Sequence, residues 1–417
     1  MSSNNSWQKV TFDQLCKNIS DRIEDPKQSK TDYYIGLEHL DSEDPKISRH
    51  GSPQDVSKTK LLFKSGQILF GKRNWYLRRL AVAKRDGICS AHMLVLDPIE
   101  GKSIKDFVSL LMFSDDFYEK ALMVSAGSMS PTIKWKDISK LEFIIPSIPE
   151  QENILNITHK IDDTISKNQN LIEKTTNYIF SKSESLLTKG INHTKFKKIN
   201  MNNDKTTNIP ENWIVSSLES VIGNKKNSLK RGPWGSSLKK SFFVKSGFKV
   251  YQQQNAIYTN VEYGDYYIDD DKFHELKDFE VKSGDFIISC SGTIGKIYQI
   301  PTQAQKGIIN QALLKISINE NVMDNNFFKF LFQSFGFQRL FLSSSHGSAM
   351  KNVPSIKQIK QIPIFLPPIS EQKQISNIIL DLNNHLAQQQ SHLINLKSLR
   401  KSILNSRLTK ETSIVTN

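Results

Sequence analysis

The sequence predicts an α+β fold made of two equivalent halves, each a globular domain followed by one long helix. Three observations predict this fold. A stretch that leads into a helical pattern occurs twice, 221 residues apart. Each helical pattern continues for many turns without an interior glycine or proline, apart from its first turn. The segment before each pattern carries short apolar runs bounded by turn residues, which are typical of strands.

The elements follow one another in the same order in both halves. Residues 1–148 contain strand-like runs at Tyr33-Tyr-Ile-Gly-Leu37, Gln67-Ile-Leu-Phe70 and His92-Met-Leu-Val-Leu96. Residues 149–190 have the pattern of a single helix. Residues 191–368 resemble the first globular segment, and residues 369–417 contain a second helix and a tail. We therefore expect two globular domains, 1–148 and 191–368, each followed by a helical segment.

The repeat extends into the globular segments. Trp7-Gln-Lys-Val-Thr-Phe-Asp-Gln-Leu15 matches Trp213-Ile-Val-Ser-Ser-Leu-Glu-Ser-Val221, and Lys64-Ser-Gly-Gln-Ile-Leu69 matches Lys282-Ser-Gly-Asp-Phe-Ile287. Gly87-Ile-Cys-Ser-Ala-His-Met-Leu-Val-Leu96 matches Gly307-Ile-Ile-Asn-Gln-Ala-Leu-Leu-Lys-Ile316. The offsets are 206, 218 and 220, so loop lengths vary on a constant frame. Divergent loops on one frame are suited to reading two different targets, although a structural domain can also be duplicated without such a role.

Both helical segments carry apolar residues at heptad spacing, as a and d positions of a coiled coil do. The spacing predicts that the two helices pair with each other, with Asn168 and Gln389 at corresponding polar positions of the seam. The residues expected to pack between the helices are Ile154, Ile161, Ile165, Ile172, Ile179, Ile375, Leu382, Leu386, Leu393 and Leu396. A helix from Ile154 to Lys189 would span about 54 Å, which favours a spacer over an ordinary packing element.

Charge and composition indicate the class of partner. The chain of 417 residues has a formal net charge of +14, which favours nucleic acid or another acidic partner. The three cysteines lie far apart without metal-ligand spacing, as expected for a reduced cytoplasmic compartment. No signal peptide or apolar run long enough to cross a membrane is present, so we expect neither secretion nor membrane insertion.

Two windows without acidic residues are rich in lysine and arginine. The first extends from Lys58 to Arg85, and the second lies between Glu219 and Glu262 and contains Trp234. One such window is usually a solvated surface, but two at comparable places of a duplicated frame favour contacts with DNA phosphates and base edges. The predicted DNA contacts are Lys72, Arg73, Arg78, Arg79, Lys84, Arg85, Lys225, Lys226, Lys230, Arg231, Lys239 and Lys240.

Motifs of catalysis are missing. The sequence has no phosphate-binding loop of the Walker type, no glycine-rich cofactor fingerprint and no amino-methyltransferase motif. Asp269-Asp-Asp271 and Glu275 only loosely resemble a nuclease constellation, and the other half has no counterpart. We therefore expect no catalytic residue, no metal site and no cofactor in this chain.

The order of these motifs, twice over, resembles the DNA specificity subunit of type I restriction-modification systems across essentially the full length. The resemblance rests on the Trp-x-x-x-x-Leu/Phe start of each half, the Lys-Ser-Gly strand and the Gly-Ser segments at Gly127 and Gly347. It rests also on Ile145-Pro146…Glu150-Gln151 and Leu366-Pro367-Pro368…Glu371-Gln372 before the helices. Where the second copy has Pro367-Pro368, the first has Pro146-Ser147, which puts the shape of its helix start in doubt.

The resemblance implies two target-recognition domains separated by two long antiparallel coiled-coil helices with pseudo-two-fold symmetry. Each domain would read one half of a bipartite site in double-stranded DNA, and the helices would dock two modification subunits. Those subunits would carry S-adenosylmethionine, and restriction subunits would add ATP-driven translocation and Mg-dependent nuclease activity in phage defence. The chain itself would be a non-catalytic specificity subunit. The alternative from another class is a coiled-coil adaptor that binds acidic proteins without DNA specificity.

Overall fold

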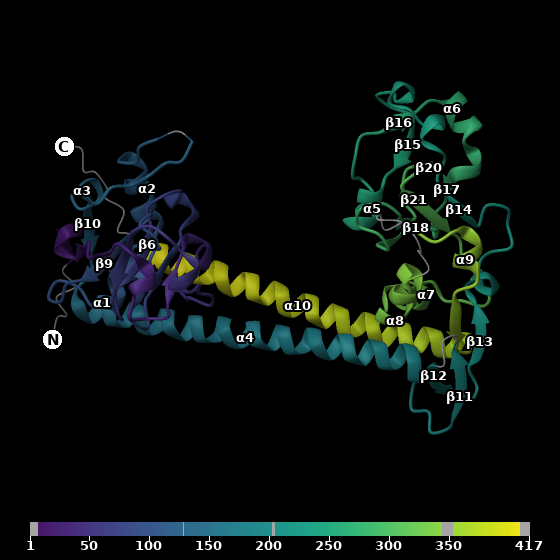
Figure 1. Cartoon of the computed structure of the whole chain (residues 1–417), viewed down its shortest axis with the longest axis horizontal. Helices are drawn as coiled ribbons and strands as arrows, with labels where there is room; N and C mark the ends of the chain where they lie inside the picture. Colours follow the sequence, from purple (N-terminus) through teal and green to yellow (C-terminus); the bar gives the residue numbers. More distant parts are fainter. Residues whose placement is uncertain (1–6, 128, 202–204, 344–352, 409–417) are drawn as a thin grey trace. The chain divides into compact units, whose positions relative to one another are not determined.

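The computed structural model describes residues 7–127, 129–201, 205–343 and 353–408. The chain divides into two compact units (Figure 1). The first unit comprises residues 1–171 and 389–417, and the second comprises residues 172–388. Each unit thus contains one globular domain and a part of both long helices. Among the described helices, none is long and apolar enough to cross a membrane.

The globular domain of the first unit has two four-stranded sheets and one two-stranded sheet. Their strand orders are β2-β9-β6-β7, β3-β5-β8-β4 and β1-β10. The strands are β1 Gln8–Thr11, β2 Cys16–Ile19, β3 Arg22–Ile23, β4 Tyr34–Ile35, β5 Lys60–Phe63, β6 Ile68–Gly71, β7 Leu80–Val82, β8 Gly87–Cys89, β9 Met93–Pro98 and β10 Glu142–Ile145. The helices are α1 Lys105–Leu111, α2 Asp115–Met123 and α3 Trp135–Ile138, and they contribute Phe107, Phe117 and Ile138 to the main core.

The globular domain of the second unit repeats this arrangement. Its sheets have the orders β14-β21-β18-β19, β16-β15-β20-β17 and β13-β22, with an additional hairpin β11-β12. The strands are β11 Phe196–Met201, β12 Lys205–Pro210, β13 Ile214–Ser217, β14 Leu229–Arg231, β15 Phe248–Tyr251, β16 Tyr267–Ile268, β17 Glu280–Val281, β18 Phe286–Ser289, β19 Ile297–Gln299, β20 Gly307–Ile309, β21 Leu313–Ile316 and β22 Pro363–Leu366. The helices are α5 Gln253–Ile257, α6 Asp270–Glu275, α7 Asn325–Gln333, α8 Phe335–Ser343 and α9 Ile356–Lys360.

The two domains correspond strand by strand. The sheet β2-β9-β6-β7 corresponds to β14-β21-β18-β19, because the repeated sequences at residues 64 and 282 lead into β6 and β18. In the second sheet, β4 runs parallel to β8, and β15 runs parallel to β20. Helices α1, α2 and α3 correspond to α7, α8 and α9, which start 220 or 221 residues later. The predicted pseudo-two-fold repeat in an α+β fold is confirmed.

The long helices are α4, Ile148–Lys189, and α10, Ile369–Leu408. They run antiparallel within each unit. In the first unit Arg400 Nε donates to Asp162 Oδ1 at 2.6 Å, and Arg407 lies 3.3 Å from Glu150. In the second unit Leu186 and Ile375 share one apolar core. The antiparallel pair that the resemblance implies is therefore present.

The burial of the heptad positions is graded. Four residues of the expected seam are buried: Ile154, Ile165, Ile179 and Ile375. The other expected seam residues are half-buried: Ile161, Ile172, Leu382, Leu386, Leu393 and Leu396. Asn168 and Gln389 are half-buried as well. The seam is thus covered by the partner helix on one side only, and the helix ends are sealed by the globular domains.

A buried glutamine joins each globular domain to the start of its own helix. Gln151 Nε2 donates to the carbonyls of Pro146 at 2.9 Å and Lys102 at 3.3 Å, and its Oε1 accepts from the Ile104 amide at 2.9 Å. Gln372 repeats this pattern with Pro367, Val322 and Asp324 at 2.9, 3.0 and 2.9 Å. Because both helices start at corresponding residues and are held alike, the Pro146-Ser147 sequence does not change the helix start.

A second joint comes from the opposite helix. The amide of Asp115, the first residue of α2, donates to Asn405 Oδ1 of α10 at 3.2 Å. The amide of Phe335, the first residue of α8, donates to Glu184 Oε1 of α4 at 2.7 Å. Asn405 and Glu184 are themselves 221 residues apart. Each globular domain is thus fixed to the start of one long helix and to the end of the other.

Candidate nucleic-acid interface

One end of the main sheet is nearly identical in the two domains. Before β6 and β18, the turns 64–67 and 282–285 both read Lys-Ser-Gly-polar, and their glycines have φ values of 87° and 88°. Gln67 Oε1 accepts from the Lys64 amide at 2.8 Å, and Asp285 Oδ2 accepts from the Lys282 amide at 2.8 Å. We call this the constant end. A surface of the same sequence in both domains is poorly suited to reading two different targets.

The opposite end of the same sheet carries loops that differ between the domains. We call it the variable end and define it by residues 36–46, 72–79 and 90–92 in the first unit. In the second unit it consists of residues 232–237, 252–258, 290–296 and 310–312. The loops project from a shared backbone frame. Ser90 N donates to Ile35 O and Asn310 N to Tyr251 O, both at 2.9 Å.

The same frame holds the loop after β6 and the loop after β18. Lys72 N donates to His92 O at 3.0 Å, and Cys290 N donates to Ala312 O at 2.8 Å. Beyond these bonds the sequences diverge, with Lys-Arg-Asn-Trp-Tyr-Leu-Arg-Arg at 72–79 and Cys-Ser-Gly-Thr-Ile-Gly-Lys at 290–296. Variable loops on a rigid frame are where binding specificity is usually located. The variable end is therefore the better candidate interface.

The basic residues predicted in the first domain lie at both ends. Lys72, Arg73, Arg78 and Arg79 belong to the variable end, whereas Lys84 and Arg85 follow β7 at the constant end. Arg73, Lys84 and Arg85 are exposed, and Arg85 lies over the ring of Tyr33 at 3.8 Å. Burial, and then the positive charge of Arg22, lower the pKa of Lys72. The structure thus brings only part of the predicted set together.

The second basic window occupies a different place in the fold from the first. Lys225 and Lys226 precede β14, Lys230 and Arg231 lie on β14, and Lys239 and Lys240 follow the turn at 232–237. All six residues are exposed except the half-buried Lys230. The first window covers β5, β6 and β7, which correspond to β17, β18 and β19. The expectation that the two windows fall at comparable places is therefore wrong, because similar charge arose on different strands.

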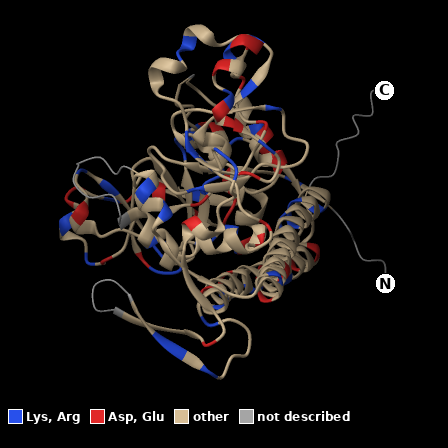
Figure 2. Ribbon diagram, turned by 90° about the vertical axis from the view of Figure 1, so that its right-hand side faces the viewer, with Lys and Arg blue, Asp and Glu red and all other residues tan. Residues whose placement is uncertain are grey.

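Acidic and basic stretches are both present on the second unit. Figure 2 shows lysine and arginine on several segments, the hairpin β11-β12 among them, and acidic residues on others. Asp269 caps α6 by accepting from the Lys272 amide at 2.9 Å, and Lys272 Nζ lies 2.8 Å from Glu275. Within the described residues, no group of three or more His, Cys, Asp or Glu side chains could hold a metal ion. Ser128 and the Gly-Ser segment at Gly347 lie outside the described residues.

Arg78 is held by the protein itself. Its Nη2 lies 2.6 Å from Asp115 Oδ1, its Nη1 lies 3.5 Å from Glu43 Oε1, and its guanidinium stacks over Tyr118 at 4.3 Å. Burial of Asp115 disfavours its charge, but the hydrogen bonds from Arg78 and Asn405 and the nearby positive charges outweigh this and lower its pKa. Arg78 thus connects the loop 72–79 to α2 and, through Asn405, to α10.

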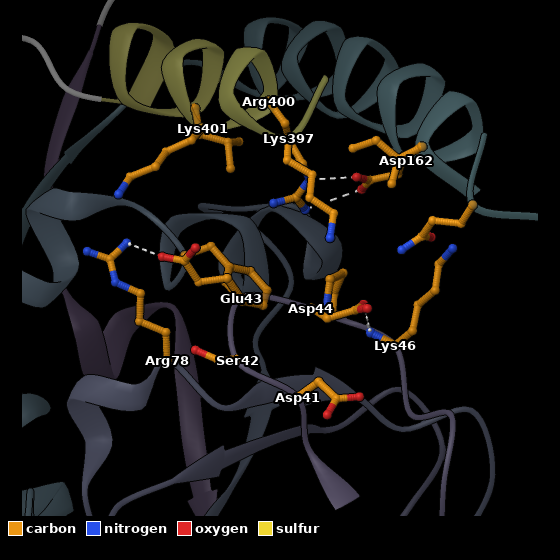
Figure 3. A pocket seen from close by; sticks show the side chains of 15 residues that line it. Asp41, Ser42, Glu43, Asp44, Lys46, Arg78, Asp162, Lys397, Arg400 and Lys401 are labelled. Carbon is orange, nitrogen blue, oxygen red and sulfur yellow. Dashed lines mark hydrogen bonds and ion pairs between the residues drawn. The ribbon is translucent and has the colours of Figure 1, made fainter. Parts of the chain in front are cut away.

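A pocket of about 330 Å³ lies beside this network, entirely within the first unit. Figure 3 shows Glu43 and Asp44 of the loop 36–46 on one side, and Lys397 and Arg400 of α10 on the other. Lys46 Nζ donates to Ser166 Oγ of α4, which ties the loop to the helix pair. The charges lining the pocket are of both signs and largely paired with each other. The pocket is therefore best understood as the joint between variable loops and helices.

Replacing Arg78 with alanine is expected to reduce the free energy of unfolding by about 1–3 kcal/mol, because it leaves Asp115 without its closest cation. The carboxylate contributes stability above the ordinary Asp pKa of about 4. That contribution is lost as pH falls through the lower pKa of the folded state. The difference between the wild type and Arg78→Ala in urea unfolding should therefore shrink below about pH 4.

Arg49→Ala is the matched control, because Arg49 forms an exposed ion pair with Asp41 in the same unit. An exposed pair contributes about 0–1 kcal/mol, so this variant should unfold almost as the wild type does. Equal stability of both variants at pH 7 would show that Arg78 is not a structural joint.

Sequence reasoning missed the residues that fix the interface in place. Asp115, Asn405 and Glu43 give no periodic or motif signal, since each acts through a residue distant in sequence. The cysteines are buried, and burial raises the pKa of Cys89 and Cys290 to about 12, which keeps both thiols protonated at neutral pH. The one signal in the sequence was the 221-residue spacing of Asn405 and Glu184, which lay outside the repeated motifs.

Comparisons with known proteins agree with this architecture. A family model described as "Type I restriction modification DNA specificity domain" matches residues 4–177 and 234–396. The type I restriction enzyme EcoDI specificity subunit of Escherichia coli is 29% identical over 171 residues, which are 40% of this chain and 38% of that protein. The type I restriction enzyme MjaVIII specificity subunit of Methanocaldococcus jannaschii is 24% identical over 83% of this chain and 76% of that protein.

A solved structure shares the fold. It is a chain from a study of complex assembly and conformational transition of the type I R-M system. It has a TM-score of 0.64 and 17% sequence identity, and the match covers 96% of this chain and 97% of that one. The frame of two sheets and a long helix in each half is thus similar even where the sequence has diverged.

Proposed function

Since the chain belongs to the family of type I restriction-modification DNA specificity domains, we propose that it is the sequence-reading subunit of such a system. Each globular domain reads one half of a bipartite site in double-stranded DNA through its variable end. Specificity subunits of this family are generally non-catalytic. We place methylation with S-adenosylmethionine, and ATP- and Mg-dependent cleavage, in separate modification and restriction subunits.

One observation carries this proposal: the constant frame ends in different loops in the two domains. Turns 64–67 and 282–285 repeat each other in sequence and backbone conformation. Loops 72–79 and 290–296 start from equivalent backbone bonds and then diverge in sequence. A pair of readers for two different half-sites needs this combination, whereas an adaptor for one kind of acidic partner has no need of divergent loops.

The helix pair supports docking of two modification subunits. Tyr178 of α4 is 56% exposed and Leu399 of α10 is 50% exposed. These residues are 221 apart and so occupy equivalent positions, one in each unit. Large apolar side chains left in water at equivalent positions are suited to two copies of one partner.

The function is tested with the full chain and a library of duplexes with randomised sequence. We expect selection to return two short conserved blocks separated by a fixed unselected spacer. Arg73→Ala and Arg231→Ala, which neutralise exposed cations at or beside the variable end, should each weaken binding. Each DNA phosphate that is no longer neutralised should reduce the slope of log affinity against log salt by about 1.

Lys84→Ala and Lys226→Ala remove the same charge at the constant end and serve as matched controls. Their binding and salt dependence should stay close to those of the wild type. Selection without any conserved block would contradict sequence reading. An equal loss of affinity in all four variants would contradict the assignment of the variable end.

A further inference from the structure

We propose, resting on the proposed function, that Trp234 is a specificity-determining residue whose indole inserts into a groove of the DNA and stacks on bases of one half-site. Five tryptophans occur in the chain, and all five lie in the described residues. Trp75 and Trp213 are buried, whereas Trp234 is 86% exposed. Leaving so large an apolar surface in water is costly, and a binding partner that covers it would recover that free energy.

The chain holds this tryptophan on a fixed base. Gly232 N donates to Leu313 O at 2.9 Å, and a side chain at Gly232 would place its Cβ 1.8 Å from Asn310 O. Only glycine therefore allows this close approach of the turn to the β20–β21 connection. Pro233 is buried next to it, and Ser237 N donates to Trp234 O at 2.9 Å to close the turn. Trp234 projects from a turn whose backbone is already ordered, which lowers the entropy lost on binding.

The surroundings favour DNA over a protein partner. Arg231, Lys239 and Lys240 are exposed and lie within six residues of Trp234 along the chain. No acidic residue occurs in the sequence between Glu219 and Glu262. The turn belongs to the variable end, where its anchor Asn310 also receives the backbone of the loop after β15 through Tyr251 O. Cations that bind phosphates next to an aromatic wedge are a combination that DNA-bending proteins use.

The first domain has a different device at its variable end. The chain that follows β2, the counterpart of β14, is Ser20-Asp21-Arg22 and contains no aromatic residue. Loss of Trp234 should therefore affect only the half-site that the second domain reads. A wedge also favours base steps that unstack easily, so it selects sequence without hydrogen bonds to base edges.

The test uses the full chain with Trp234→Ala and Trp234→Phe. Against the duplex that the wild type selects, Trp234→Ala should bind about 5- to 100-fold more weakly, the range given by the loss of one aromatic stack. Trp234→Phe should retain part of the affinity. Repeating the randomised selection should show a weakened preference at one or two adjacent positions of a single block. Duplex should quench indole emission in the wild type and not in Trp234→Phe.

Ile214→Ala is the control, because Ile214 is 62% exposed on β13, away from the variable end. It should bind and select DNA as the wild type does, and thermal unfolding should be unchanged in all variants. Wild-type selection without a conserved block would refute the proposed function itself. A bipartite wild-type site with unchanged affinity and preference in Trp234→Ala would overturn this inference alone. Weaker binding of a modification subunit with unchanged DNA binding would also overturn it.

Discussion

Replacing Gln372 with leucine is expected to lower the stability of the second unit by about 3 kcal/mol or more. The side chain is fully buried and bonds to Val322 O, Pro367 O and Asp324 N. Leucine fills a similar volume but leaves these three backbone groups without a partner. Each buried group without a partner costs about 1–3 kcal/mol, so their sum exceeds the effect of an average core substitution.

Hydrogen exchange measured by mass spectrometry can locate this effect. Amides of α7 and of the first turns of α10 should exchange faster in Gln372→Leu, while those of the first unit should not change. Gln151→Leu should produce the same effect in the first unit, at α1 and the start of α4. Gln374→Leu makes the same chemical change on the exposed side of α10 and should leave exchange unaltered. Equal protection in Gln372→Leu and Gln374→Leu would contradict the role of the buried glutamine.

Introducing aspartate at Tyr178 or Leu399 is expected to remove one of two docked modification subunits. A charge buried in an apolar interface without a partner costs several kcal/mol, which is sufficient to abolish an interface of ordinary size. Native mass spectrometry of the chain co-expressed with the modification subunit of its own system should show two copies for the wild type. Each single variant should bind one copy, and the double variant should bind none.

Thr176→Asp and Ser398→Asp are the matched controls, since both residues are exposed on the same two helices. They add the same charge beside the proposed docking positions and should keep both copies. If either single variant lost both copies, the two positions would not act as equivalent and separate docking points. If both single variants kept two copies, docking would lie elsewhere on the helices.

Most of the fold could be predicted because its signals are local or repeated. The Lys-Ser-Gly turns, the heptad rows and the Glu-Gln pairs recur at nearly fixed spacing, and each now corresponds to a structural element. The repeat of Gln151 and Gln372 was visible, but its reason was not, because the carbonyl and amide groups they bind are backbone groups of loops 44–50 residues away.

The interface was harder to predict from charge. Arg78 and Arg73 look alike in the sequence, yet Arg78 is bound by Asp115 and Glu43 while Arg73 is exposed. Lys84 lies close to them in the sequence but at the opposite end of β7. Charge density along a chain does not indicate which end of a strand a residue occupies or whether an internal partner neutralises it. Whether these residues bind DNA stays a prediction.

The composition of the first unit has a consequence for how the protein is made. Its core includes Leu404 and Leu408 of α10, packed with Ile154 and Leu155 of α4. The second unit, by contrast, is one continuous segment. During translation the ribosome therefore releases every residue of the second unit before the last residues of the first. The domain that is synthesised first must wait, with part of its apolar surface uncovered, until the second domain has been made.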